Sequence, residues 1–174
     1  KLAITGANVT VTDSAFNAKE KGLDIKGTNA KASVLKIEGL TGTVNTIDKF
    51  ATVTLAGQVV VEKSVKAATT LELTSDGDLI LINGATVTTA TLKSDGGKIG
   101  LQKAESAKKF KSVTKFTAVD GEGVSFYSVK YDAEWKAYVE DAANFDAGTL
   151  VAQDTKKTIS ADTANAFFDV TGLI

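Results

Sequence analysis

Three carboxylates in a pair of repeated turns are the residues of this sequence best suited to bind a metal ion. Asp76 lies in a Ser-Asp-Gly triplet, Asp78 follows it, and Asp95 lies in a second triplet nineteen residues later. If the turns stack, their oxygens suit Ca²⁺, which accepts irregular oxygen coordination. The alternative is ordinary turn chemistry, in which Asp bonds its own backbone and Gly takes a positive φ. We favour this alternative and expect no cofactor, because EF-hand loops and nonapeptide Ca²⁺ repeats are absent.

Aromatic side chains cluster in the stretch GVSFYSVKYDAEWKAYVED. Tyr127, Tyr131, Trp135 and Tyr138 form a candidate ligand-binding platform, because exposed aromatic rings stack on sugars or anchor protein interfaces. The competing interpretation is that these rings form the core of a small module, since large apolar side chains mostly lie inside. We favour the core. In a strand Tyr127 and Tyr131 share one face and Phe126 lies on the other, so we expect at least one of the two sets to be exposed.

The absent residue types exclude several classes of function. The chain contains no Cys, His, Met, Pro or Arg, and its net charge is −1. Without His and Cys there is no Ser-His-Asp triad and no imidazole or thiolate metal site. Without Arg or a basic excess, the chain lacks the electrostatic features of a nucleic-acid binder. No apolar run reaches the ~20 residues that span a bilayer. We predict no catalytic residues, although paired carboxylates for glycoside hydrolysis stay open.

A short unit of alternating apolar residues that ends in glycine recurs along the first hundred residues. Clear copies read LAITG, LDIKG, LKIEG and VTLAG, and looser copies read LELTSDG and TLKSDG. Their final glycines stand at positions 6, 27, 39, 57, 77 and 96, so four of the five intervals lie between 18 and 21 residues. The alternation predicts a strand in each unit, and the glycine predicts the turn that follows.

This spacing predicts an all-β protein whose main part is a parallel β-helix, or β-solenoid, with coils of about 18–21 residues. The same turn sequence recurs at the same position of successive repeats, which favours coils stacked on one another. Equivalent residues of stacked coils lie about 4.8 Å apart. The alternative is two immunoglobulin-like β-sandwich domains, in which turns recur every 8–12 residues or so. In the solenoid, eight side chains should line one continuous core, stacked in register: Leu35, Ile37, Val53, Leu55, Leu71, Leu73, Leu79 and Leu81.

The composition changes near residue 105, which divides the chain into predicted coils at 1–105 and an aromatic-rich module at 106–174. Ten of the twelve aromatic residues lie in the second part. There, Val124–Tyr131 and Trp135–Val139 alternate around the turn residues DAE and predict a β-hairpin. We expect this β or α+β module to cap the last coil, because an open coil exposes unpaired strand edges.

Two further segments give predictions of local secondary structure. The Lys-rich segment Lys103–Val113 predicts a short helix or a linker. Ser160 is a candidate N-cap for a second short helix. At the other end, the stretch KLAITGANVTVT shows no cap, so we expect further coils or another domain to precede Lys1 and cover that edge.

The repeats resemble those of bacterial cell-surface proteins, namely S-layer subunits and β-solenoid adhesins of the filamentous-haemagglutinin kind. The resemblance rests on LKIEG, VTLAG, TLELTSDGDLILING and TLKSDGGKIGL, and on a composition without Cys or Met. It covers about the first 105 residues. It implies a secreted, extracellular protein whose partners are its own copies, neighbouring domains or cell-surface polysaccharide.

Together these observations predict a non-enzymatic structural or adhesive module of a bacterial cell-surface protein. One alternative is a carbohydrate-binding module with Trp135 and its neighbouring tyrosines as the platform. Another is a glycan-active enzyme built on a β-helix. Exposure of Trp135 favours the carbohydrate-binding module, and two carboxylates facing each other across a groove would indicate the enzyme.

Overall fold

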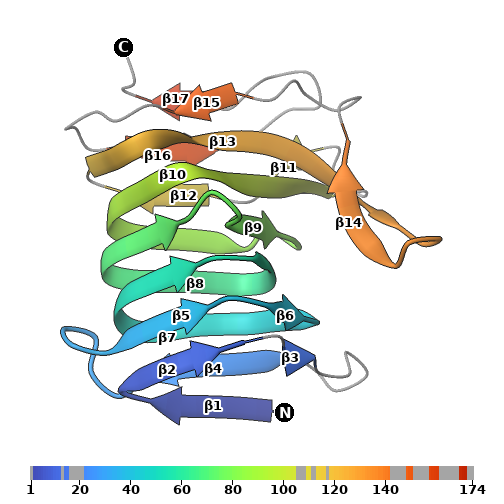
Figure 1. Ribbon diagram of the computed structural model, residues 1–174. Helices are drawn as coiled ribbons and strands as arrows, with labels where there is room; N and C mark the ends of the chain where they lie inside the picture. The colour runs from blue at the N-terminus through green and yellow to red at the C-terminus, as the bar shows by residue number, and fades with distance from the viewer. Residues whose placement is uncertain are drawn as a thin grey trace.

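The computed structural model describes residues 2–12, 14–15, 22–104, 109–110, 113–116, 118–141, 148–150, 157–160 and 169–171 of the chain. All regular elements in these ranges are β-strands (Figure 1). Among the same residues there is no helix of the length and apolarity needed to cross a membrane.

Most strands stack as the coils of a parallel β-solenoid of about four turns, with the N-terminal coil at the bottom of Figure 1. The first column of stacked strands contains β1 (Leu2–Gly6), β4 (Leu23–Gly27), the first part of β7 (Thr43–Leu55), the middle of β8 (Gln58–Leu73), the start of β10 (Thr86–Ala104) and β12 (Val113–Phe116). The second column contains β2 (Asn8–Val11), β5 (Val34–Ile37), the ends of β7 and β8, the middle of β10 and the start of β13 (Ala118–Asp132). The third column contains the start of β8, β9 (Asp78–Leu81) and the later parts of β10 and β13. β3 (Ser14–Ala15) and β6 (Leu40–Thr41) form a separate short pair.

The register of the coils confirms the predicted solenoid and rules out the two sandwiches. Ile4, Ile25, Ile47, Val65 and Val87 are successive neighbours in the first column, so the coils measure 21, 22, 18 and 22 residues. These pairings are all parallel, whereas a sandwich with hairpin turns would have antiparallel ones.

The apolar residues of the repeats form the core, as predicted. All eight side chains named from the sequence are fully buried in one cluster, and Leu35, Val53, Leu71 and Leu92 stack as direct register neighbours. The cause is the period of two, which sends alternate side chains of a strand to opposite faces. The strand β5 shows this alternation, with Leu35 and Ile37 buried and Val34 and Lys36 exposed.

A glycine allows two coils to meet closely at the corner between the second and third columns. A Cβ at Gly77 would lie 2.4 Å from the carbonyl oxygen of Leu55 in the preceding coil. The expected positive φ is found at Gly96, where φ is 91°. Gly77 is therefore required by a close backbone approach rather than by its own turn conformation.

The last four strands in the described ranges pair antiparallel with their neighbours. β14 (Ala137–Glu140) and β15 (Gly148–Leu150) pair with β13, β16 (Lys157–Ser160) pairs with β12, and β17 (Asp169–Thr171) pairs with β16. The parallel pairing of β13 with β10 carries the sheet across residue 105, and the domain boundary placed there stays a prediction.

The helix expected within Lys103–Val113 is wrong for the residues that the structure describes. Lys103 and Ala104 end β10 and pair antiparallel with β11 (Lys109–Phe110). Strand pairing satisfies the backbone groups here, and this tertiary contact outweighs the local tolerance for a helix. Ser160 is the last residue of β16. In the segment SADTANAFFDV, where the sequence predicted a short helix, residues 161–168 lie outside the described ranges, and Asp169 and Val170 belong to β17 rather than to a helix.

The stacked core gives a first testable prediction. Leu73→Ala should lower the free energy of unfolding by about 2–5 kcal/mol, because the side chain is fully buried between Leu55 and Ser94 of the neighbouring coils. Urea unfolding followed by circular dichroism measures the loss. The control Thr69→Ala, on the exposed corner of the same strand, should change stability by no more than about 0.5 kcal/mol. Equal effects from both variants would contradict the assigned core.

Candidate functional site

The two Ser-Asp-Gly turns lie at the same corner of the solenoid but are out of phase by one residue or more. Leu73 pairs with Ser94 before the corner, and Asp78 pairs with Lys98 after it. The corner therefore holds four residues in one coil, 74–77, and three in the next, 95–97. As a result, Asp95 aligns with Thr74 or Ser75 rather than with Asp76. The expected stacking of the two aspartates is thus absent, although both side chains are exposed.

Asp78, the third proposed metal ligand, is already bound by protein groups. Its Oδ1 accepts a hydrogen bond of 2.6 Å from the Tyr127 hydroxyl, and its Oδ2 accepts one of 3.1 Å from Gln58 Nε2. In the part of the chain that the structure describes, no three Asp or Glu side chains gather closely enough to hold a metal ion. Within the turns, Gly77 N donates a hydrogen bond of 2.8 Å to the carbonyl oxygen of Thr74, and Gly97 N donates one of 2.8 Å to Ser94 Oγ. Ca²⁺ binding stays an alternative to the turn chemistry that we favoured from the sequence.

Tyr127 joins the C-terminal hairpin to the outside of the third column. Its side chain crosses Gly100, where a Cβ would lie 3.0 Å from the ring carbon Cζ and 2.7 Å from Val129 Cγ1. Burial, followed by the hydrogen bond to Asp78, raises the pKa of the Tyr127 hydroxyl well above its usual value. The sequence gives no local sign of this contact, because Tyr127 and Asp78 are 49 residues apart.

A second apolar cluster lies outside the solenoid wall, beneath the hairpin. Ile80, Ile82 and Val129 are buried there, and Val60, Tyr127 and Tyr138 pack against them. Burial also raises the pKa of Tyr138. Tyr127 and Tyr138 thus hold the hairpin against the wall, whereas Tyr131 and Trp135 do not take the core position that the sequence favoured.

The other two residues of the proposed platform are exposed. Tyr131 contacts Tyr138 edge to face, with ring centroids 5.4 Å apart and an interplanar angle of 65°, and 52% of its surface is exposed. Trp135 lies in the loop between β13 and β14 and is 75% exposed. The predicted hairpin is present, with a second strand that begins at Ala137 rather than at Trp135.

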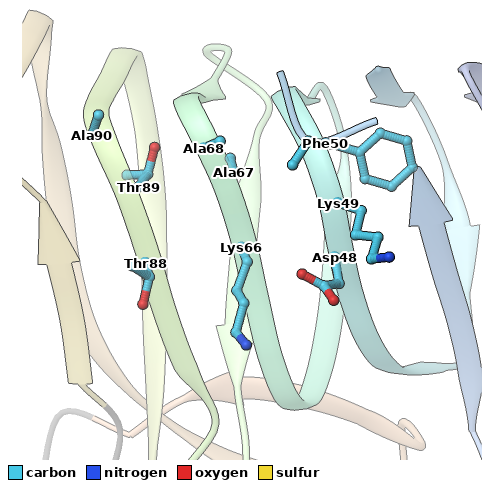
Figure 2. A pocket seen from close by; sticks show the side chains of 10 residues that line it. Asp48, Lys49, Phe50, Lys66, Ala67, Ala68, Thr88, Thr89 and Ala90 are labelled. Carbon is cyan, nitrogen blue, oxygen red and sulfur yellow. The ribbon is translucent and has the colours of Figure 1, made fainter. Parts of the chain in front are cut away.

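A shallow groove of about 300 Å³ runs along the corner between the first and second columns (Figure 2). Asp48, Lys66 and Thr88 stand in a row on three successive coils, beside Lys49, and small alanine side chains border them. This row was not predicted from the sequence. A pattern in the sequence could have revealed it, because each residue of the row directly follows a core residue of the first column. These core residues are Ile47, Val65 and Val87.

Calcium tests the turn interpretation of the acidic corner. Millimolar Ca²⁺ should leave the melting temperature unchanged, because Asp78 is already hydrogen-bonded and Asp76 and Asp95 are out of phase. Differential scanning fluorimetry with and without EDTA measures the effect. A rise with Ca²⁺ that disappears in the Asp76→Asn/Asp95→Asn variant would establish a metal site, since a ligand of the folded state stabilises it.

The Tyr127 contact is tested by removing one oxygen atom. Tyr127→Phe should lower the free energy of unfolding by about 1.5–3 kcal/mol, as expected for a hydrogen bond to a charged group. The folded state holds the pKa of Tyr127 above its unfolded value, so this residue stabilises the protein below about pH 10 and the benefit falls as pH rises further. Urea unfolding at pH 7 and pH 11 measures both effects. Tyr131→Phe is the matched control, and an equal loss there would contradict the assignment.

Comparison with known proteins gives no family assignment. No protein-family model, curated protein or solved structure matches this sequence.

Proposed function

We propose that this chain is a non-enzymatic structural or adhesive module of a bacterial cell-surface protein. The observation that carries the proposal is the use of polar side chains to bind one coil to the next. The cell-surface location rests on the resemblance of the repeats to S-layer subunits and β-solenoid adhesins.

Carboxylates on the outer wall bind groups of neighbouring coils. Glu72 accepts hydrogen bonds from Thr54 Oγ1 on one side, at 3.2 Å, and from Lys93 Nζ on the other, at 2.8 Å. The hydrogen bond from Lys93 is the main cause that lowers the pKa of Glu72. Thr54, Glu72 and Lys93 are register neighbours, so this one carboxylate connects three coils.

The same arrangement recurs elsewhere on the wall. Asp24 Oδ1 accepts hydrogen bonds of 2.8 Å from both Asn45 Nδ2 and Thr46 Oγ1 of the next coil. Asp78 likewise connects Gln58 of the preceding coil with Tyr127 of β13. These acids serve as cross-links along the solenoid axis, which is the role expected in a load-bearing rod.

The first coil presents a surface for association. Among the described residues, β1 pairs only with β4 and β2 pairs only with β5, so one edge of each strand has no strand partner there. Leu2, which continues the column of Leu23, is 46% exposed, and Ile4 and Val9 are only partly buried. An exposed strand edge beside apolar side chains is a template for another strand. We propose that a second copy of the chain pairs with this edge when the 174 residues are present by themselves.

Self-association is tested on the 174-residue chain by size-exclusion chromatography with light scattering. The molar mass should rise with concentration, and Leu2→Lys should abolish the rise, because a charge at a strand edge opposes pairing. Val34→Lys is the matched control, since Val34 is 41% exposed but lies on β5, between β2 and β7. It should associate like the unmodified chain.

Two results would overturn the proposed assembly. One is a strictly monomeric chain at every concentration. The other is an equal loss of association in both variants, which would show that the contact lies away from the β1 edge.

A further inference from the structure

The end of the β13–β14 hairpin exposes two aromatic rings without an evident structural benefit. Trp135 is the only tryptophan of the chain, and 75% of its surface is in solvent, together with 52% of Tyr131. A ring of this size stabilises a protein chiefly by being buried. The ribbon of the hairpin projects sideways from the solenoid, and its loop lies at the outer end (Figure 1).

The loop that carries Trp135 is held in place by its own hydrogen bonds. Asp132 Oδ1 accepts one from the backbone N–H of Glu134, at 2.9 Å, and one from that of Trp135, at 3.1 Å. Lys136 completes the turn with a φ of 51°. Asp132 and Ala137 close the loop as a strand pair. The backbone under the indole is thus fixed before any ligand arrives.

The stem of the hairpin is equally well supported. Tyr131 rests against Tyr138, and Tyr138 packs on the apolar cluster outside the third column. Tyr127, four residues before Tyr131 on the same strand, is hydrogen-bonded to Asp78 of the solenoid wall. A preformed site loses less conformational entropy on binding than a mobile one.

We propose that Tyr131 and Trp135 form a binding site for β-linked pyranose polysaccharides. The faces of such sugar rings carry C–H groups that pack on aromatic rings, and their hydroxyls hydrogen-bond to side chains at the ring edge. Asp132, Glu134 and Lys136 supply those polar groups. The site goes beyond the structural role proposed above and does not depend on it.

The residues around the rings favour a sugar over a protein partner. The segment from Tyr131 to Ala137 reads YDAEWKA, in which the only aliphatic side chains are alanines. The core of a protein interface is depleted in charged residues and surrounds its anchors with further packed side chains. Here the two rings alternate with charged and small residues, an arrangement that suits a hydroxyl-rich ligand.

The single tryptophan makes binding directly measurable. Cellohexaose and chitohexaose, two soluble β-1,4-linked oligosaccharides, are titrated into the 174-residue chain carrying Leu2→Lys, which removes self-association through β1. At least one should shift Trp135 emission to shorter wavelength in a saturable way, with a Kd of about 0.1–1 mM.

Calorimetry on variants identifies the residues that bind the sugar. Trp135→Ala should abolish binding, and Tyr131→Ala should weaken it about tenfold or more. Lys130→Ala is the matched control, because Lys130 is exposed beside Tyr131 but on the opposite face of the strand, and it should bind normally. Circular dichroism should show that all three variants remain folded.

Three results would overturn the site. The first is unchanged emission with both oligosaccharides up to about ten times the expected Kd. The second is an emission shift caused by raising the protein concentration without sugar, which would assign the rings to a protein contact. The third is an equal loss of binding in Lys130→Ala. None of these results bears on association through β1, which light scattering tests separately.

Discussion

Backbone hydrogen bonding between successive coils is the constraint on which the other features of this structure depend. Strands of one coil pair with strands of the neighbouring coils, and a slip of one residue would turn the apolar side chains of a coil outward. Residues that a coil does not need for strand pairing must therefore lie at the corners between the columns. The segment Thr28–Ser33 is such an insertion, and a hydrogen bond from Asn29 N to Ser33 Oγ closes it. Directly after this segment, Val34 pairs in register with Asn8 and Thr52 of the neighbouring coils.

The same register also orders the outer wall. Along one row of the second column the residue types run Lys, Thr, Glu, Lys and Asp, at Lys36, Thr54, Glu72, Lys93 and Asp120. No two neighbours in this row carry the same charge, and like charges directly opposite each other would be destabilising. A shift of one coil against the next would break the contacts of Glu72 with Thr54 and Lys93. The outer wall thus reinforces the register that the buried core requires.

Local alternation was sufficient to predict the core, because Leu71 and Leu73 reveal their buried face within a single strand. Contacts between distant residues were not predictable in this way. The phase of Asp95 against Asp76 depends on how many residues each corner holds, which only the pairing of Leu73 with Ser94 reveals. The contact between Tyr127 and Asp78 depends on the absence of a side chain at Gly100. The sequence could predict an exposed set of aromatic residues but not that Tyr127 and Tyr138 would be packed while Trp135 is exposed.

Parallel stacking in register can be tested directly by disulfide formation, since the chain has no cysteine of its own. Thr52 and Thr70 are register partners, so their Cα atoms are about 4.8 Å apart, within the range that a disulfide spans. Thr54 and Thr70 are offset by two residues, which places their Cα atoms about 8 Å apart, beyond that range. We predict that the Thr52→Cys/Thr70→Cys variant forms an intramolecular disulfide on mild oxidation and that the Thr54→Cys/Thr70→Cys variant does not. The opposite outcome, or equal cross-linking of both variants, would contradict the stacked solenoid.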